Sequence, residues 1–429
     1  MKILKAYKNF HVAVIFVLFY QGVLLASLNL HPKLDYAISF LLYFLVFIFY
    51  SNRIFLINRW LFYSIIVVTP SLLVGILLGW DYIDIAADVA RYLAPFLGYT
   101  AGILLLNQLE YYRILYVLYG LLALQILSFY DSVFSKISHV FGGGPLVEYS
   151  NYGLEVSSLY FFLSYFLLKN KIALGFKKIL LISYVIGFII SPILLMSKAR
   201  TLTMVFSFIF IFIFYSNLRS KLKMLLLTAI MIISSFLFFN ERTFNSQTAF
   251  DYNVFSRFQD TIELFKTDDY SADASTSFRV SEIVNVTKTL VNTSPYSLPF
   301  GLGSGSLYYD KYSQILGGIS KENYRPDGGI HDIFAIPFAY LFRYGFIGLL
   351  FMAFFIVHIY RKIKVDNLNA HQDTIAASLK LYIIISLIAD LFVPVHVYGN
   401  PQFGFIIALG IIMQNKLKGQ YNSLNNSAI

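Results

Sequence analysis

The sequence contains no cysteine and few charged residues. Of its 429 residues, 13% are charged and 58% are hydrophobic, with a mean hydropathy of +0.67. The absence of cysteine excludes disulfides, thiolate nucleophiles and cysteine-ligated zinc. Soluble globular chains carry about 25% charged residues, so the low charge indicates a polytopic membrane protein.

The net charge of +10 follows from the positions of the basic residues. Lys and Arg lie mainly in short loops between apolar runs, which is the pattern of the positive-inside rule. We therefore expect no nucleic-acid partner. The first apolar run has no convincing small-residue cleavage site, so we expect it to be a spanning helix rather than a signal peptide.

The apolar runs predict an all-α membrane protein with about 12 transmembrane helices, because a span needs roughly 20 mostly apolar residues. The runs are 9–28, 35–51, 60–79, 92–107, 114–133, 156–168, 179–197, 201–217, 223–239, 332–360, 379–398 and 401–415. They divide the chain into helices one to nine (1–239), a large polar loop with short amphipathic helices (240–331), and helices ten to twelve with a C-terminal tail (332–429). The run 332–360 is too long for one straight span. We expect Phe334 to Tyr344 to form a short re-entrant or interfacial helix, with a break at Gly345.

The basic residues also predict the orientation. With twelve spans, the basic loops fall on one side of the membrane, which places both termini in the cytoplasm. The acidic run Asp81, Asp84 and Asp88 and the large loop then lie on the opposite, periplasmic side.

Two segments on the periplasmic side carry arginines that suit an anionic ligand. In Ser197-Lys-Ala-Arg200-Thr201, snorkelling cations and a headgroup-binding turn are equally good interpretations. In the loop, Arg279–Val291 has the apolar spacing of an amphipathic helix, with an N-cap in the region of Ser277. Arg279 near that N-terminus is unfavourable for the helix dipole but well placed for a phosphate. The glycine loop Gly301–Gly305 lacks the lysine of a P-loop and is interpreted as a connector.

His331 follows two glycines at the point where the chain re-enters an apolar run. A lone histidine is more often structural, but the adjacent glycines allow a ligand to approach, and histidine is the usual general base for a hydroxyl. No histidine pair has the H-x-x-x-H spacing, so we expect no metal of that type.

Together these motifs resemble the O-antigen polymerase and O-antigen ligase superfamily. The resemblance rests on Ser-Lys-Ala-Arg200-Thr, then Ser-Phe-Arg279 with Pro-Phe-Gly-Leu-Gly-Ser-Gly downstream, and finally His331-Asp332 followed by Phe-Arg-Tyr-Gly345-Phe-Ile-Gly348. Their order covers most of the chain. Asp332 is a departure, because many relatives, especially ligases, have asparagine there.

The resemblance implies a GT-C-like, metal-independent, inverting glycosyltransferase of the bacterial inner membrane that needs no cofactor. Its substrates would be undecaprenyl-diphosphate-linked oligosaccharides in the surrounding lipid. Arg200 and Arg279 would hold the donor diphosphate, and His331 would take the proton from the acceptor hydroxyl. Further candidates for substrate binding are Arg257, Arg91, Arg325 and Tyr324, although a salt bridge from Arg91 to Asp84 or Asp88 is the simpler interpretation.

Three functions remain open on the sequence. The first is a surface-polysaccharide polymerase, favoured by the aromatic-rich composition and by Asp332, with a chain-length regulator as a possible partner. The second is an O-antigen ligase that transfers glycan to the lipid A core. The third is a lipid-linked oligosaccharide flippase or another transporter, which would carry charged residues inside its spans.

Overall fold

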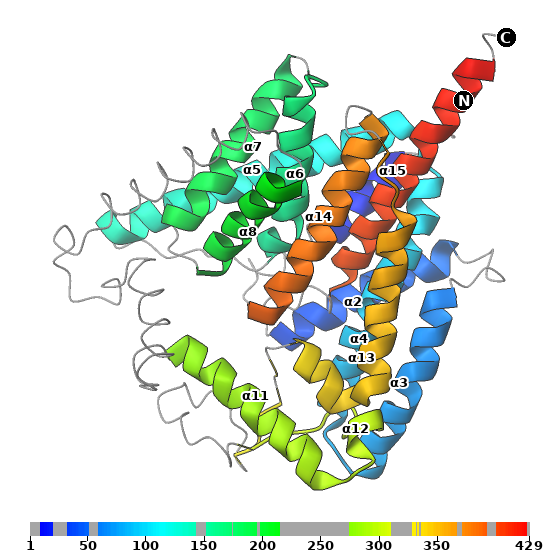
Figure 1. Ribbon diagram of the computed structural model, residues 1–429, viewed down its shortest axis with the longest axis vertical. Helices are drawn as coiled ribbons and strands as arrows, with labels where there is room; N and C mark the ends of the chain where they lie inside the picture. The colour runs from blue at the N-terminus through cyan, green and yellow to red at the C-terminus, as the bar shows by residue number, and fades with distance from the viewer. Residues whose placement is uncertain are drawn as a thin grey trace.

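The computed structural model describes residues 9–19, 32–50, 59–142, 152–173, 175–194, 198–214, 274–309, 328–331, 333, 336–366, 371–392 and 400–426. Within these ranges the fold is almost entirely helical (Figure 1). Residues 9–19 are helical and are followed by α2 (Pro32–Tyr50), α3 (Arg59–Leu77), α4 (Tyr82–Asn107), α5 (Tyr111–Gly142), α6 (Tyr152–Lys169), α7 (Phe176–Leu194), α8 (Lys198–Phe214), α11 (Ala274–Thr293), α12 (Ser297–Phe300), α13 (Ile336–Lys362), α14 (His371–Phe392) and α15 (Pro401–Asn426).

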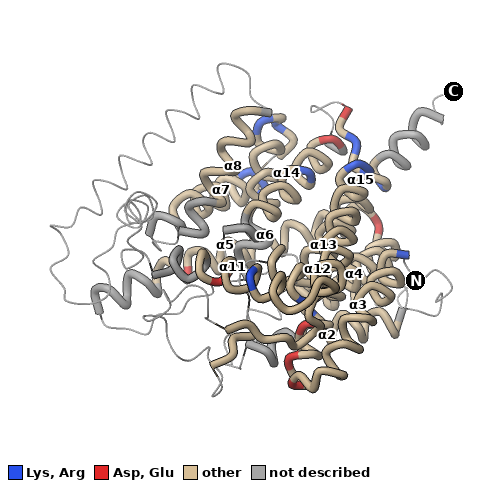
Figure 2. Tube along the Cα trace, turned by 60° about the horizontal axis from the view of Figure 1, so that its bottom comes forward, with Lys and Arg blue, Asp and Glu red and all other residues tan. Residues whose placement is uncertain are grey.

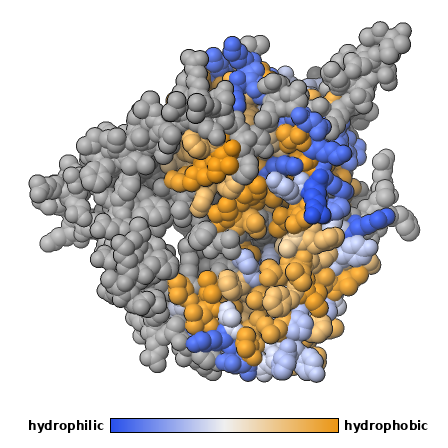
Figure 3. Space-filling view, viewed as in Figure 1, coloured by the Kyte–Doolittle hydropathy of each residue, from blue (hydrophilic) through white to orange (hydrophobic). Residues whose placement is uncertain are grey.

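Four stretches of the described chain are long and apolar enough to cross a membrane: Arg59–Leu77, Tyr82–Asn107, Tyr111–Asp131 and Ile336–Lys362. Their outward faces carry many exposed leucine, isoleucine and phenylalanine side chains. Figure 3 shows these apolar faces across the middle of the molecule, with hydrophilic residues gathered toward its ends. This distribution is that of a membrane protein, because apolar surface on this scale is rare on a soluble monomer. The predicted run 223–239 lies outside the described residues.

Helix α4 is the centre of the bundle, packed by α2, α3 and α15. Its contact with α15 depends on glycines: a Cβ on Gly98 would overlap the carbonyl oxygen of Pro401, and one on Gly404 would overlap that of Pro95. Gly98 and Gly102 form a G-x-x-x-G pair, which lets two helix backbones approach closely. The second group of helices, α5 to α8, joins this centre through α14, which packs against both α6 and α15.

Helix α4 begins earlier than the apolar run predicts. The prediction was 92–107, whereas the helix starts at Tyr82, with Asp81 as its N-cap accepting a hydrogen bond from the backbone N–H of Ile83 at 2.8 Å. The error arose because polar residues at the start of a helix were assigned to the loop. Consequently, Asp84 and Asp88 lie in the first two turns of a candidate span.

Two features near the large loop can be compared with the prediction. The break at Gly345 is confirmed: this residue adopts φ 65° and ψ −168° inside α13, a conformation open essentially only to glycine. The helix predicted at Arg279–Val291 is also present, as α11, but it begins at Ala274. Ser277 therefore lies within the first turn rather than at the N-cap, and Arg279 falls in the second turn.

Candidate functional site

Four ionisable side chains from distant parts of the chain meet in the interior. Asp84 and Asp88 come from the start of α4, His331 from the segment before α13, and Arg343 from the short part of α13 that precedes its break. Asp84 and Asp88 are fully buried, and His331 and Arg343 are 5% and 3% exposed. We call these four residues the ionic cluster. Buried charges of this kind must be paired, because an isolated one is very costly.

Asp88 is the hub of the ionic cluster. Its Oδ2 atom lies 2.8 Å from Arg343 Nε and 3.2 Å from His331 Nε2, and it accepts a hydrogen bond from the backbone N–H of Gly305 at 2.7 Å. The Arg343 guanidinium beside this oxygen and the hydrogen bond from Gly305 N–H favour the ionised carboxylate. Gly305 has φ +82° and lies against Ile85 and Trp80, so only glycine allows the chain to come this close.

The two ring nitrogens of His331 face different groups. Nε2 lies 3.2 Å from Asp88 Oδ2 and 3.4 Å from Arg343 Nη2. In one tautomer Nε2–H donates to Asp88, and in the other Nε2 accepts a hydrogen bond from Arg343. Nδ1 lies 3.7 Å from Asp84 Oδ1, which is beyond hydrogen-bond length.

Arg343 is held from both sides. Its Nη2 donates to the carbonyl oxygen of His331 at 2.5 Å, which fixes the guanidinium against the histidine segment. Its own carbonyl accepts hydrogen bonds from Ser71 Oγ at 2.9 Å and from Gly303 N–H at 3.2 Å. The next residue, Tyr344, donates its hydroxyl to the carbonyl of Asp88 at 2.6 Å. These bonds connect α3, α4, α13 and the glycine loop at the ionic cluster.

A short antiparallel bridge places His331. Tyr308 and Ile330 exchange two backbone hydrogen bonds, from Tyr308 N–H to Ile330 at 3.0 Å and in the reverse direction at 2.9 Å. Both side chains are buried in a small apolar core with Phe342, and Tyr308 donates its hydroxyl to Glu282 of α11 at 3.4 Å. His331 follows the bridge directly, so its backbone is fixed by packing.

The structure places the predicted site residues as follows. His331 is in the ionic cluster, and Arg91 lies one turn after Asp88 on α4 and interacts electrostatically with it. Asp88 also forms an ion pair with Arg343, and His331 lies within 4 Å of both aspartates. Arg200 lies in the first turn of α8 and Arg279 lies in the second turn of α11. The structure describes the backbone of these two residues but not their side chains. Arg257, Tyr324, Arg325 and Asp332 lie outside the described residues.

Sequence reasoning missed Asp84, Asp88 and Arg343 as members of a site. Asp84 and Asp88 are four residues apart, which puts them on one face of a helix, and this spacing was a usable signal once α4 was extended to Tyr82. Arg343 was quoted only as part of a motif. Its charge was unexplained in an apolar segment, and such a residue is a site candidate by default.

The ionic cluster is suited to proton transfer at a hydroxyl. It combines a histidine, two carboxylates that would stabilise the imidazolium, and an arginine that offsets their charge. Among the described residues, no group of three or more His, Asp and Glu has the arrangement of a metal site. No family model, curated protein or solved structure matches the chain, so its function is inferred from this geometry and from the motifs.

Proposed function

We propose that the protein is a membrane-embedded polysaccharide polymerase: a metal-independent, inverting, GT-C-like glycosyltransferase with about 12 spans. It would transfer an undecaprenyl-diphosphate-linked glycan onto a hydroxyl of a lipid-linked repeat unit. The observation that supports the proposal is the contact of His331 Nε2 with buried Asp88 at 3.2 Å; in the tautomer that donates Nε2–H to Asp88, Nδ1 would be the general base. The motifs around Arg200, Arg279 and His331 supply the substrate class.

In this reaction Nδ1 of His331 takes the proton of the acceptor hydroxyl. The hydroxyl oxygen forms a bond to the anomeric carbon of the donor, and the bond from that carbon to the diphosphate oxygen breaks, with inversion. The proton remains on an imidazolium flanked by Asp84 and Asp88. General-base catalysis contributes typically ~10²–10⁴-fold.

The leaving diphosphate needs positive charge, which we assign to Arg200 and Arg279. Two guanidinium groups can bind its oxygens bidentately and stabilise the charge that develops as the bond breaks. Removing one such charge-stabilising donor costs about 10²–10³ in kcat. In this scheme the two guanidinium groups supply the positive charge that the leaving diphosphate needs, so the step as written does not use a metal ion.

The position of the ionic cluster along the helices supports an active site at a membrane surface. Asp84 and Asp88 lie in the first two turns of α4, and Arg343 lies two residues before the break in α13. Basic residues lie at the opposite ends of these helices: Arg361 and Lys362 are in the last turn of α13, and Lys416 of α15 contacts Asn107 at the end of α4. Figure 2 shows the basic residues of α15. By the positive-inside rule that end faces the cytoplasm, which puts the cluster at the periplasmic face of the inner membrane and both termini inside.

The two alternatives differ in how they use this geometry. An O-antigen ligase would use the same residues with the lipid A core as acceptor. A flippase or other transporter is favoured by one observation, the charged Asp84, Asp88 and Arg343 within candidate spans. A transport pathway places such groups near the middle of the membrane, however, whereas these lie at the ends of their helices.

The test is reconstitution of purified protein with undecaprenyl-diphosphate-linked repeat units. A ladder of longer lipid-linked glycans supports the polymerase, transfer only after lipid A core is added supports the ligase, and neither product supports transport. Arg200→Ala, Arg279→Ala and His331→Ala should each abolish extension while the protein remains inserted. Lys288→Ala is the matched control for Arg279, because Lys288 is an exposed cation on the same helix. Full activity in the three variants would overturn the assignment.

A further inference from the structure

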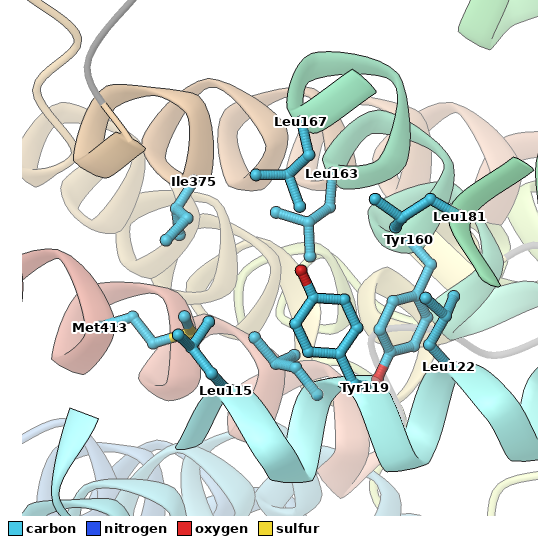
Figure 4. Close-up of a pocket in the computed structure, with 10 residues that line it drawn as sticks. Leu115, Tyr119, Leu122, Tyr160, Leu163, Leu167, Leu181, Ile375 and Met413 are labelled. Atoms are coloured by element: carbon cyan, nitrogen blue, oxygen red, sulfur yellow. The ribbon is translucent and has the colours of Figure 1, made fainter. Parts of the chain in front are cut away.

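The seam between the two groups of helices is closely packed. Figure 4 shows Tyr119 of α5 pointing toward Leu163 of α6, and the space left between α5, α6, α7, α14 and α15 measures about 10 Å³. A cavity of this size holds at most one water molecule, so the seam is a packed interface rather than a binding site. Two buried polar side chains that the proposed reaction leaves unused, Tyr308 and Glu282, lie on the side of His331 instead.

Tyr308 is fully buried and joins the two segments that carry the base and the arginine of the ionic cluster. Its backbone exchanges two hydrogen bonds with Ile330, the residue before His331. Its ring lies edge-on to that of Phe342, the residue before Arg343, with the ring centres 6.5 Å apart. The placement of Tyr308 therefore fixes the backbone next to both members of the cluster.

The hydroxyl of Tyr308 reaches the helix of the large loop. It donates a hydrogen bond at 3.4 Å to Oε1 of Glu282, which is also fully buried. Val286 and Leu290, one and two turns further along α11, pack in the same small apolar core as Tyr308. Residues four apart are neighbours on a helix, so these three positions form one face of α11. Because Arg279 precedes Glu282 by three residues, α11 is docked within one turn of Arg279.

The polar contact adds what the apolar contacts cannot supply. Val286 and Leu290 hold α11 against the core, but hydrophobic contacts are non-directional and allow a helix to rotate or slide. A hydrogen bond restricts both length and angle. The buried carboxylate of Glu282 therefore fixes the rotation and the register of α11 relative to Tyr308.

We propose that Tyr308 and Glu282 are positioning residues that set the distance between Arg279 and the ionic cluster. This inference rests on the proposed function, in which Arg279 holds the donor diphosphate and His331 takes the acceptor proton. Because the reaction inverts, the diphosphate leaves from one face of the anomeric carbon while the hydroxyl attacks the other. The arginine and the base must therefore be held at a fixed separation, and misplacement by about 1 Å can cost about 10²-fold in rate.

Double electron–electron resonance spectroscopy measures this placement without requiring activity. The chain has no cysteine, so Lys288→Cys on α11 and Val357→Cys on α13 introduce the only two sites for spin labels. Both positions are exposed, and Val357 lies 12 residues after Gly345, about 18 Å along the helix. We expect one narrow distance distribution. Tyr308→Phe keeps the ring and the backbone pairing but removes the hydroxyl, and it should broaden or shift the distribution.

Two further variants make the result specific. Glu282→Gln retains an amide oxygen that can accept the hydrogen bond, and it should keep the narrow distribution. Tyr296→Phe is the matched control, because it removes the hydroxyl of a tyrosine that is 76% exposed. An unchanged distribution in Tyr308→Phe would show that α11 is held without this hydroxyl and would overturn the proposal. Equal broadening in Tyr296→Phe would also overturn it.

Glycan-transfer kinetics connect the placement to the proposed reaction. With undecaprenyl-diphosphate-linked repeat units, Tyr308→Phe should lower kcat by up to about 10²-fold. In an Arg279→Lys background the same substitution should cost nothing further, because the hydroxyl acts through the placement of Arg279. Additive losses would show that Tyr308 acts elsewhere and would overturn the proposal. Absence of transfer by the unmodified protein would overturn the proposed function instead, and the spin-label distances would still decide whether Tyr308 places α11.

Discussion

Replacing Asp88 with asparagine tests the ionic cluster most directly. The substitution keeps the shape of the side chain and removes its charge, while Arg343 remains 3% exposed and loses the anion 2.8 Å from its Nε. Breaking a buried ion pair on one side costs about 3–5 kcal/mol, because the remaining charge stays buried without compensation. We therefore expect Asp88→Asn to lower the free energy of unfolding by about 3–5 kcal/mol. Thermal unfolding in detergent measures the change, with the exposed acid Asp131→Asn as control.

The double variant Asp88→Asn/Arg343→Met separates charge compensation from simple loss of packing. Methionine removes the buried cation, so the double variant should regain at least half of the stability lost in Asp88→Asn. Glycan extension should not recover, because His331 still lacks the carboxylate that orients Nε2, and we expect activity to remain about 10²–10⁴-fold lower. Additive losses of stability in the double variant would refute the pairing of Asp88 with Arg343. Full activity in Asp88→Asn would refute its role in positioning His331.

Three further substitutions test the framework around the site, each followed by fluorescence-detected size-exclusion chromatography and thermal unfolding. Gly345→Ala should cost about 1–3 kcal/mol for its backbone conformation, and more because its Cβ would overlap the Pro299 carbonyl; a stability equal to that of the parent would show that α13 is not broken there. Gly98→Ala should reduce the yield of monodisperse protein, since its Cβ would overlap the Pro401 carbonyl, and unchanged yield would contradict the close contact of α4 and α15. Ser71→Ala should cost about 1–3 kcal/mol for a lost buried hydrogen bond, and no measurable change would contradict the link from α3 to α13.

The sequence allowed the helices to be predicted better than their ends. Apolar runs identified helical segments because a membrane permits few other structures, and Gly345 marked a break because one run was too long. The start of α4 was missed because hydropathy alone gives polar residues to loops. Asp81 as an N-cap was the signal that could have corrected it.

The candidate site was predicted only in part, for a physical reason. His331 was identified from its type and its neighbours, which are local properties. The pairing of Asp88 with Arg343 depends on how α4 packs against α13, and no local pattern encodes the partner of a buried charge. The G-x-x-x-G pair of Gly98 and Gly102 indicates a close contact between two helices, but the pattern does not identify α15 as the partner.

The glycine loop and the break in α13 work as one unit. A helix that ends at a break leaves its last carbonyls without intrahelical partners. Here the carbonyl of Phe342 accepts a hydrogen bond from Leu302 N–H at 2.7 Å, and that of Arg343 accepts one from Gly303 N–H at 3.2 Å. The same loop then donates Gly305 N–H to Asp88. The glycine loop thus caps the part of α13 before the break through Leu302 and Gly303, and it positions Asp88 through Gly305.

This arrangement bears on why the ionic cluster exists at all. Buried ion pairs add little net stability, and well-packed apolar residues of similar volume often serve better. The chain nevertheless directs a broken helix, a glycine loop and a backbone bridge toward one aspartate, one arginine and one histidine, at the end of the helices rather than at their middle. Titratable groups that are buried and fixed by several contacts are concentrated at functional sites. The ionic cluster is therefore a candidate functional site rather than a feature of stability alone, and His331 with Asp88 is the first pair to test for the proposed proton transfer.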